Sequence, residues 1–384
     1  MLTSQPVPFT IDVPEPVLED LRERLARTRL PSAVPGSGWA HGVDVEYLRE
    51  LVDHWLHRYD WRAAERDLNR MPQRMTAVDG VPLHFVHAEG RGPAPLPLLF
   101  SHGWADSFWS VHKIIGPLSD PAAHGGDPAD AFHVVAPSLP GFAFSGDPGR
   151  AGINGAVTAD LFTSLMRDQL GYRRFGLQGG DWGSRLVSTL AHRHPDAAVG
   201  LHLNLCLLMP DLGPASAPLT PAERRHVAAL QKWQATEGAY LAVQNTKPQA
   251  LAVGLNDSPA GLAGWLLQGF RAYSDCGGDL DKAFTKDELI TNLMIYWVTG
   301  TVNSSMRLYY EGEREDVRYP RITTPTAFAN FPAEMFAPPR EWAQRIYDVQ
   351  RWTDFPRGGH FAAVEEPELL VEDIRAFYRP LRAR

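Results

Sequence analysis

Apolar residues at helical spacing mark the first 75 residues of the chain. In residues 14–31 they recur every three or four positions, with Arg and Glu between them and a proline at each end. A second amphipathic run places Tyr47, Leu51 and Trp55 on one stripe. These patterns predict a helical N-terminal segment, residues 1–75.

Alternating apolar and polar residues follow this segment. The runs MTAVDG and VPLHFVHA alternate with a period of two, and Asp79-Gly80 stands between them. An Asp-Gly pair between two alternating runs is typical of a tight turn. The sequence therefore predicts a β-hairpin.

From about residue 95 the pattern changes to short, continuous apolar runs. Each is bounded by Gly or Pro and separated from the next by room for a helix: PLPLLFS, FHVVAPS, RRFGLQGG, AVGLHLNL and TPTAFANF. Such strands alternating with helices predict a parallel sheet covered on both faces. The interval 207–318 is instead helical and rich in Trp and Tyr. We predict an α/β core, residues 76–206 and 319–384, with an inserted helical cap, residues 207–318.

Composition narrows the class of protein. With 37 Lys and Arg against 45 Asp and Glu in 384 residues, the net charge is −8, which argues against nucleic-acid binding through a basic surface. No run of eighteen apolar residues and no signal peptide are apparent, and the two cysteines, Cys206 and Cys276, form no C-x-x-C motif. We expect a cytoplasmic protein without a membrane partner, from a bacterium if the frequent Pro, Gly, Ala and Arg reflect a GC-rich gene.

Candidate chemistry centres on Gly179-x-Asp181-x-Gly183, between a predicted strand and a helical run. This is the spacing of a nucleophile elbow, with aspartate where a serine hydrolase has serine. Glycines suit the strained backbone and close strand–helix approach of such a corner. The pattern predicts Asp181 as a nucleophile, and the simpler alternative is a Gly-rich turn with Asp as a helix cap.

Two further loops fit the same arrangement. Ser101-His102-Gly103-Trp104 follows the first core strand, where a backbone N–H contributes to an oxyanion hole, so Trp104 and Trp182 are the expected donors. His360, on a Gly-flanked loop near the C-terminus, suits a general base.

The acid that orients His360 has two candidates. Glu334 directly follows the strand TPTAFANF, and Asp354 lies closer to the histidine in sequence. We favour Glu334, because a late strand of the sheet should place it beside the base, and Asp354 stays the alternative.

Taken together, these motifs resemble the microsomal-type epoxide hydrolase family of the α/β-hydrolase fold. The matching stretches are SHGWADSFW, PSLPGFAFS, LQGGDWGS, EGAYLAVQNTKP, LNDSP, YWVTGTVNSSMRLYYE, PTAFANFPAE and RGGHFAAVEEPELL, and the N-terminal segment resembles the family's extension. The resemblance implies conversion of an epoxide to a vicinal diol through an aspartyl ester, without metal or cofactor. It assigns the nucleophile, base and acid to Asp181, His360 and Glu334, and the two tyrosines that activate the epoxide oxygen to Tyr240 and Tyr309.

The chain departs from the family in one loop. Ala105 replaces the proline after His-Gly-Trp, and Asp106 follows it, so a cis peptide bond is not expected there. Tyr310 is adjacent to Tyr309 and is a possible substitute for it. The cap residues Trp265 and Trp297 are candidates either for the cavity lining or for the core.

Two other functions are compatible with the motifs. A haloalkane dehalogenase also uses an aspartate and a histidine, but commonly has Asn where this chain has Trp104. A non-catalytic binding protein on a hydrolase scaffold would be expected to lack one member of the triad. We also expect a homodimer, and detoxification, aromatic hydrocarbon catabolism and secondary-metabolite biosynthesis are all compatible roles.

Overall fold

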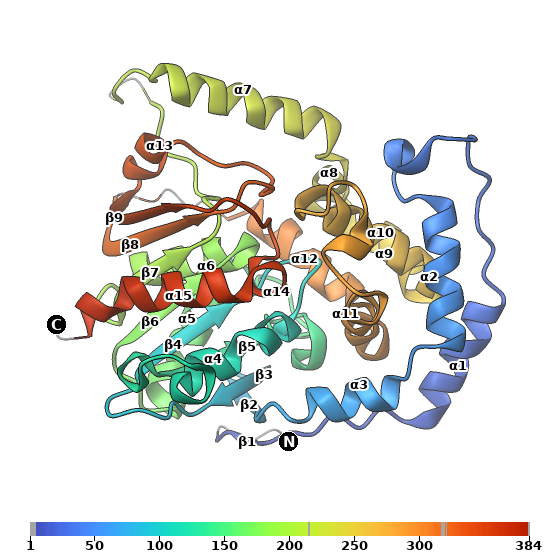
Figure 1. The fold of residues 1–384 in the computed structure, drawn as a ribbon, viewed down its shortest axis with the longest axis horizontal. Helices are drawn as coiled ribbons and strands as arrows, with labels where there is room; N and C mark the ends of the chain where they lie inside the picture. Colours follow the sequence, from blue (N-terminus) through green and yellow to red (C-terminus); the bar gives the residue numbers. More distant parts are fainter. Residues whose placement is uncertain (1–4, 214–215, 316–318, 320, 383–384) are drawn as a thin grey trace.

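A mixed β-sheet forms the centre of the molecule in this computed structural model, which describes residues 5–213, 216–315, 319 and 321–382 (Figure 1). Within these residues the sheet has nine strands in the order β1-β2-β3-β5-β4-β6-β7-β8-β9. The strands are β1 (Val7–Pro8), β2 (Gln73–Val78), β3 (Val81–Ala88), β4 (Leu96–Ser101), β5 (Phe132–Pro137), β6 (Phe175–Gly179), β7 (Ala198–Leu203), β8 (Ile322–Asn330) and β9 (Tyr347–Asp354).

The sheet changes from antiparallel to parallel at β5. Strands β2 and β3 form the predicted hairpin, and both turn residues, Asp79 and Gly80, have positive φ (49° and 76°), as a two-residue hairpin turn requires. From β5 to β9 every pair of neighbouring strands is parallel. Each of the five apolar runs overlaps one of these strands, so the predicted parallel core is confirmed. The sixth parallel strand, β9, lies outside these runs.

Helices cover both faces of the sheet, which explains the continuous apolar runs. In Figure 1, α4 (Ile115–Ser119) and α15 (Pro367–Tyr378) lie in front of the sheet, and α5 (Gly155–Ser164) and α6 (Asp181–Arg193) lie behind it. All five residues of β6 are buried. Two short helices, α13 (Arg340–Gln344) and α14 (Ala362–Glu365), precede β9 and α15.

Six α-helices and the short 3-10 helix Leu280–Lys282 occupy the described residues between β7 and β8. The α-helices are α7 (Pro221–Thr236), α8 (Ala239–Thr246), α9 (Pro248–Asp257), α10 (Pro259–Tyr273), α11 (Lys286–Thr299) and α12 (Val302–Gly312). The boundaries that we assign to the cap stay a prediction, and residue 318 lies outside the described residues. None of the described helices is long and apolar enough to cross a membrane.

The N-terminal segment forms α1 (Glu15–Ala26), α2 (Val45–His57) and α3 (Trp61–Leu68). The first helix is shorter than the pattern over residues 14–31 predicts. Leu30 precedes Pro31, a position that disfavours helical backbone, and Leu30 packs against the core from irregular chain. The sequence pattern also missed the short strand β1, which pairs with β2.

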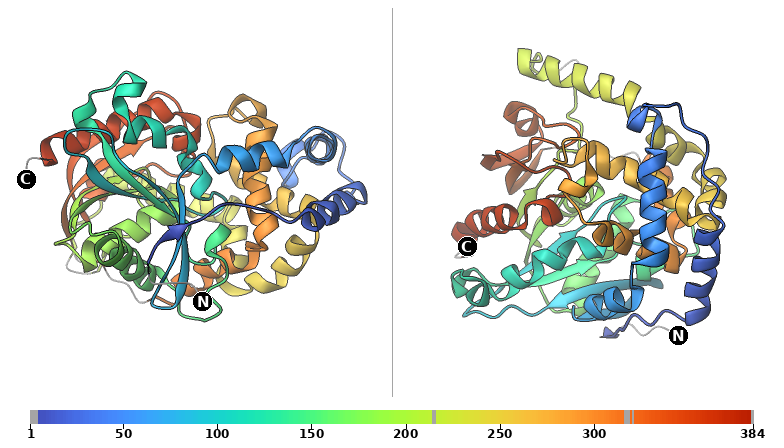
Figure 2. Two further views of the ribbon diagram at one scale, coloured as in Figure 1. Left: turned by 90° about the horizontal axis from the view of Figure 1, so that it is seen from below. Right: turned by 45° about the vertical axis from the view of Figure 1, so that its right-hand side comes forward.

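Helices α1 and α2 lie along the outer side of the cap helices (Figures 1 and 2). Polar contacts join the two layers: Arg24 pairs with Asp257 at 2.7 Å, and His54 Nε2 lies 2.6 Å from Asp287 Oδ1. In the buried layer, the Trp55 indole N–H points at the Met294 sulfur at 3.2 Å. The N-terminal segment therefore braces the cap from outside.

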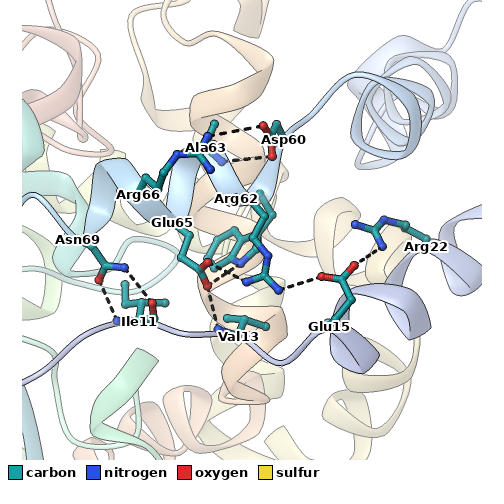
Figure 3. A network of polar contacts seen from close by, with 11 residues as sticks. Ile11, Val13, Glu15, Arg22, Asp60, Arg62, Ala63, Glu65, Arg66 and Asn69 are labelled. Carbon is teal, nitrogen blue, oxygen red and sulfur yellow. Dashed lines mark hydrogen bonds and ion pairs between the residues drawn. The ribbon is translucent and has the colours of Figure 1, made fainter.

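A buried carboxylate fastens the chain before α1 to α3 (Figure 3). Glu65 Oε1 accepts hydrogen bonds from the Val13 backbone N–H at 2.8 Å and from the Trp61 indole N–H at 3.1 Å. Its other oxygen pairs with Arg62 at 2.7 Å. Asn69 adds two side-chain hydrogen bonds to the backbone of Ile11, both 2.8 Å.

Replacing Glu65 with alanine should destabilise the protein. The change leaves two donors without their acceptor, so we expect the free energy of unfolding to fall by about 1–3 kcal/mol in chemical denaturation. Glu19→Ala is the matched control, because Glu19 is an exposed residue of α1 and its loss should change stability by less than about 0.5 kcal/mol. Equal effects of the two substitutions would contradict this role for Glu65.

Candidate active site

Asp181 lies at the corner between β6 and α6, with a positive φ of 47°. The corner can form because glycines let neighbouring segments of the chain pack closely against it. A Cβ atom on Gly183 would come within 2.0 Å of the Ser101 carbonyl oxygen, and one on Gly103 within 2.2 Å of Asp181 Oδ1. The glycines therefore let the loop after β4 reach the carboxylate, which is what the predicted elbow requires.

Backbone N–H groups stabilise the Asp181 carboxylate. The Trp104 N–H donates to Oδ1 at 2.8 Å, and the Trp182 N–H also hydrogen-bonds the carboxylate. Burial raises the pKa of Asp181, while the positive charge of His360 and these two N–H groups act in the opposite direction, and the pKa stays above its ordinary value. Both N–H groups predicted for an oxyanion hole thus converge on one carboxylate.

His360 lies between two carboxylates. Its Nδ1 is 2.6 Å from Glu334 Oε1, and its Nε2 is 3.7 Å from Asp181 Oδ2. The sequence alternative, Asp354, is exposed and accepts hydrogen bonds from Asn330 and Trp352. The structure therefore places Glu334, and not Asp354, beside the histidine.

The charges around His360 favour its protonated form. Burial would lower its pKa, but the Glu334 carboxylate and, to a smaller extent, Asp181 outweigh burial and raise the pKa to about 9. The loop that carries His360 is held in place by its own backbone N–H, which donates to the Tyr273 carbonyl at 2.8 Å.

Two cap tyrosines complete the cluster. Tyr240 of α8 and Tyr309 of α12 have ring centroids 6.2 Å apart, and both rings contact Trp104. Burial raises the pKa of each phenol well above its usual value, so both stay protonated donors. Tyr310 instead lies against Arg314, 3.4 Å from ring centroid to guanidinium carbon.

The tyrosines, Asp181 and Met335 separate two lobes of a cavity. The first lobe contains His360 and is lined further by Tyr273, Phe361 and Trp265. The second lobe is lined further by the apolar residues Trp182, Leu207, Trp233, Leu241 and Phe336 and by the polar residues Arg185, Asn245 and Glu313. Both lobes are mainly apolar, and of the two cap tryptophans considered above only Trp265 lines either of them. Trp297 lies against Arg24 of α1.

Some residues of the site carry no recognisable sequence signal. Tyr273 and Met335 enter the cavity from α10 and from the loop after β8, and neither lies in a catalytic motif. Ala105 adopts a positive φ of 69°, and the described residues contain no cis peptide bond. Asp106, next to it, is partly buried and lines a space that Asp181 and His360 also border.

Family models and relatives together match almost the whole chain. The model described as the epoxide hydrolase N terminus matches residues 6–111, and the α/β hydrolase fold model matches residues 97–260. Epoxide hydrolase 1 of Sus scrofa is 35% identical over 96% of this chain and 88% of its own. A protein of Stigmatella aurantiaca that is provisionally named an epoxide hydrolase is 41% identical over 98% of this chain and 86% of its own.

Two solved epoxide hydrolase structures superpose closely on this chain. The juvenile hormone epoxide hydrolase of Bombyx mori superposes with a TM-score of 0.88 at 29% identity, covering 100% of this chain and 96% of that one. The epoxide hydrolase of Aspergillus niger superposes with a TM-score of 0.85, also at 29% identity, covering 99% and 97%. The chain belongs to the microsomal-type epoxide hydrolase family of the α/β-hydrolase superfamily.

Proposed function

We propose that this protein hydrolyses an epoxide to a vicinal diol through an ester on Asp181. One observation carries the proposal: the Asp181 carboxylate, beside His360, shares a cavity with the two protonated phenols of Tyr240 and Tyr309. A carboxylate nucleophile and paired O–H donors are the groups that opening of a strained ether requires.

In the first step Asp181 Oδ2 attacks a ring carbon of the epoxide. The Trp104 N–H donates to the other oxygen, Oδ1, and Oδ2 lies on the side of His360 Nε2, so we assign Oδ2 as the nucleophile. A carbon–oxygen ester bond forms as the ring carbon–oxygen bond breaks. The released oxygen accepts hydrogen bonds from Tyr240 and Tyr309 and takes the proton of one of these phenols, which avoids a free alkoxide and leaves a tyrosinate.

In the second step water attacks the ester carbonyl carbon. His360 Nε2 takes the proton of that water, and the N–H groups of Trp104 and Trp182 stabilise the oxyanion. Collapse of the tetrahedral intermediate releases the diol, because the proton on His360 passes to the departing oxygen. The proton left on the Asp181 carboxyl returns to the tyrosinate and restores the carboxylate. Ester formation removes the negative charge of Asp181, one of the causes that raise the pKa of His360, so the imidazole loses its proton more readily when it must act as a base.

The two lobes define the kind of epoxide that fits. Because Asp181, Tyr240 and Tyr309 border both lobes, an epoxide ring held there can direct substituents to either side. The lining favours apolar substituents. We therefore propose that the substrate is an apolar epoxide, and that it can carry substituents on both ring carbons.

A haloalkane dehalogenase is the second candidate, and one buried N–H group favours it. The Trp104 indole N–H is buried without a hydrogen-bond partner among the described residues, so it is available to a halide. Nothing else in the cavity favours a halide over an epoxide oxygen, whereas the paired tyrosines favour the epoxide.

We also propose that the protein acts in the cytoplasm and forms a homodimer. Both cysteines are free and buried, which suits a reducing compartment. Of the compatible roles, detoxification and aromatic hydrocarbon catabolism fit the apolar lobes most directly, because both involve apolar epoxides.

Phenylalanine substitutions test the proposed function. With styrene oxide the parent protein should form the diol, and with a bromoalkane of similar size it should release no halide. Tyr240→Phe and Tyr309→Phe each remove one donor to the developing alkoxide and should lower the rate of ester formation by about 100-fold. Tyr310→Phe is the matched control and should leave that rate unchanged. Halide release by the parent, or parent-like rates in both cavity variants, would overturn the proposal.

The pH dependence of ester hydrolysis tests the His360–Glu334 pair. The hydrolysis rate should rise with pH as His360 becomes neutral, with a midpoint below about 9, because the ester removes the charge of Asp181. Glu334→Gln keeps an acceptor for Nδ1 but removes the charge that raises the pKa, so the midpoint should move to lower pH and the maximal rate should fall. Stopped-flow measurement of ester decay across pH gives both values.

Asp354→Asn is the control for this measurement, because its carboxylate contacts only Asn330 and Trp352 in the structure. Its midpoint should match that of the parent protein. If the midpoint moves with Asp354→Asn and stays fixed with Glu334→Gln, then Asp354, and not Glu334, is the acid that orients His360.

A further inference from the structure

A second space lies on the core side of Asp181. The substrate cavity is lined in part by cap helices, whereas this chamber is lined only by core residues, among them Ser101, Asp106, Gln178 and Asn204. Asp181 and His360 border both spaces. About 30 Å³ of the chamber is open to the centre of a water molecule, which is room for at least one.

The chamber walls contain polar atoms that need a partner. Ser101 Oγ and Gln178 Oε1 have no hydrogen-bond partner among the described residues, although Ser101 is 0% and Gln178 1% exposed. The Gln178 amide N–H already donates to Asn204 Oδ1 at 2.8 Å, so its oxygen is the free end. Buried polar atoms around a space of this size are typical of a site for ordered water.

Asp106 brings a carboxylate to the same chamber. Its Oδ1 accepts the Ser107 N–H at 2.8 Å, and the Tyr296 hydroxyl donates to its backbone oxygen at 2.6 Å, so the loop is fixed. Burial raises the pKa of Asp106 to about 7, although hydrogen bonds from the Ser107 N–H and the Ser110 side chain and, to a smaller extent, the charge of His360 lower it, and Asp181 raises it slightly. The charged groups that face Asp106 are thus the base and the nucleophile of the proposed reaction.

We propose that the chamber holds the water that hydrolyses the Asp181 ester, and that Asp106 is the positioning residue for this water. The inference rests on the proposed function. The water donates one O–H to His360 Nε2 and the other to Asp106, and it accepts from the Ser101 hydroxyl. As its oxygen bonds to the ester carbon, its proton passes to Nε2. The ester carbon–oxygen bond then breaks, and the proton moves to the departing alcohol oxygen.

This arrangement separates the paths of the two reactants. The apolar epoxide occupies the lobes on the cap side, and the hydrolytic water waits on the core side of the same carboxylate. A bound epoxide therefore does not have to leave or move aside before water can reach the ester. The oxygen of this water is also kept apart from the epoxide ring until the ester has formed.

Asp106→Asn is the variant that tests the proposal. Asparagine keeps an oxygen for the Ser107 N–H but places a donor NH₂ where the water needs an acceptor. Ester formation in a single turnover should proceed at the parent rate, and ester hydrolysis should slow by about 10- to 100-fold. Intact-protein mass spectrometry during turnover of styrene oxide should show the ester accumulating. Asp127→Asn is the matched control, because exposed Asp127 also accepts a neighbouring backbone N–H at 2.8 Å, and it should behave as the parent.

Ser101→Ala tests whether the chamber holds a water molecule. In a dry chamber this change removes an unsatisfied polar atom and should leave hydrolysis unchanged. In a chamber that holds the hydrolytic water it removes a hydrogen bond to that water, so hydrolysis should slow while ester formation does not. A slower hydrolysis step in both Asp106→Asn and Ser101→Ala is the expected result.

Two outcomes would overturn the proposal in distinguishable ways. His360→Asn blocks the second step, so it should trap the ester if the proposed function is right. If His360→Asn traps the ester but Asp106→Asn hydrolyses it at the parent rate, or loses both steps in equal proportion, the positioning role is wrong. If no variant, His360→Asn included, forms an ester, the proposed function fails and this inference fails with it.

Discussion

A buried carboxylate at a left-handed backbone corner is the constraint on which the rest of the site depends. Asp181 is only 8% exposed, yet its charge is compensated by two backbone N–H groups and by His360. The Trp104 N–H reaches it only because Gly103 and Gly183 leave no Cβ atoms between the loop after β4 and the start of α6. A side chain at either glycine would push apart the two elements that hold the nucleophile and its hydrogen-bond donor.

The balance of charge around this corner couples the two proposed steps. In the free protein one histidine lies between Asp181 and Glu334, so the imidazolium is favoured and the nucleophile has a positive neighbour. An ester at Asp181 removes one of the two negative charges and makes the imidazole a better base. The cap supplies the phenols and, braced from outside by α1 and α2, closes the apolar lobes over the corner.

Local sequence patterns predicted those parts of the molecule that local chemistry determines. The apolar runs located the parallel strands, and Gly179-x-Asp181-x-Gly183 located the corner, because both depend on neighbouring residues. Glu334 and Asp354 both stand at the ends of parallel strands on the same edge of the sheet, so strand position alone does not separate them. The loop after β8 bridges to the histidine loop through Ala333 and Gly359, and this brings Glu334 to His360. The early end of α1, the strand β1, the entry of Tyr273 and Met335 into the cavity and the chamber at Asp106 all depend on contacts between distant segments, which no single stretch of sequence records.

The source of the first oxygen atom in the product tests the account most directly. A single turnover of styrene oxide, with protein in excess and in water labelled with oxygen-18, should give a diol that contains no label, because the incoming oxygen comes from the Asp181 carboxylate. The label should then be found in the protein, on that carboxylate. A diol fully labelled in the first turnover, with no label in the protein, would show that water attacks the epoxide directly and would contradict the ester mechanism.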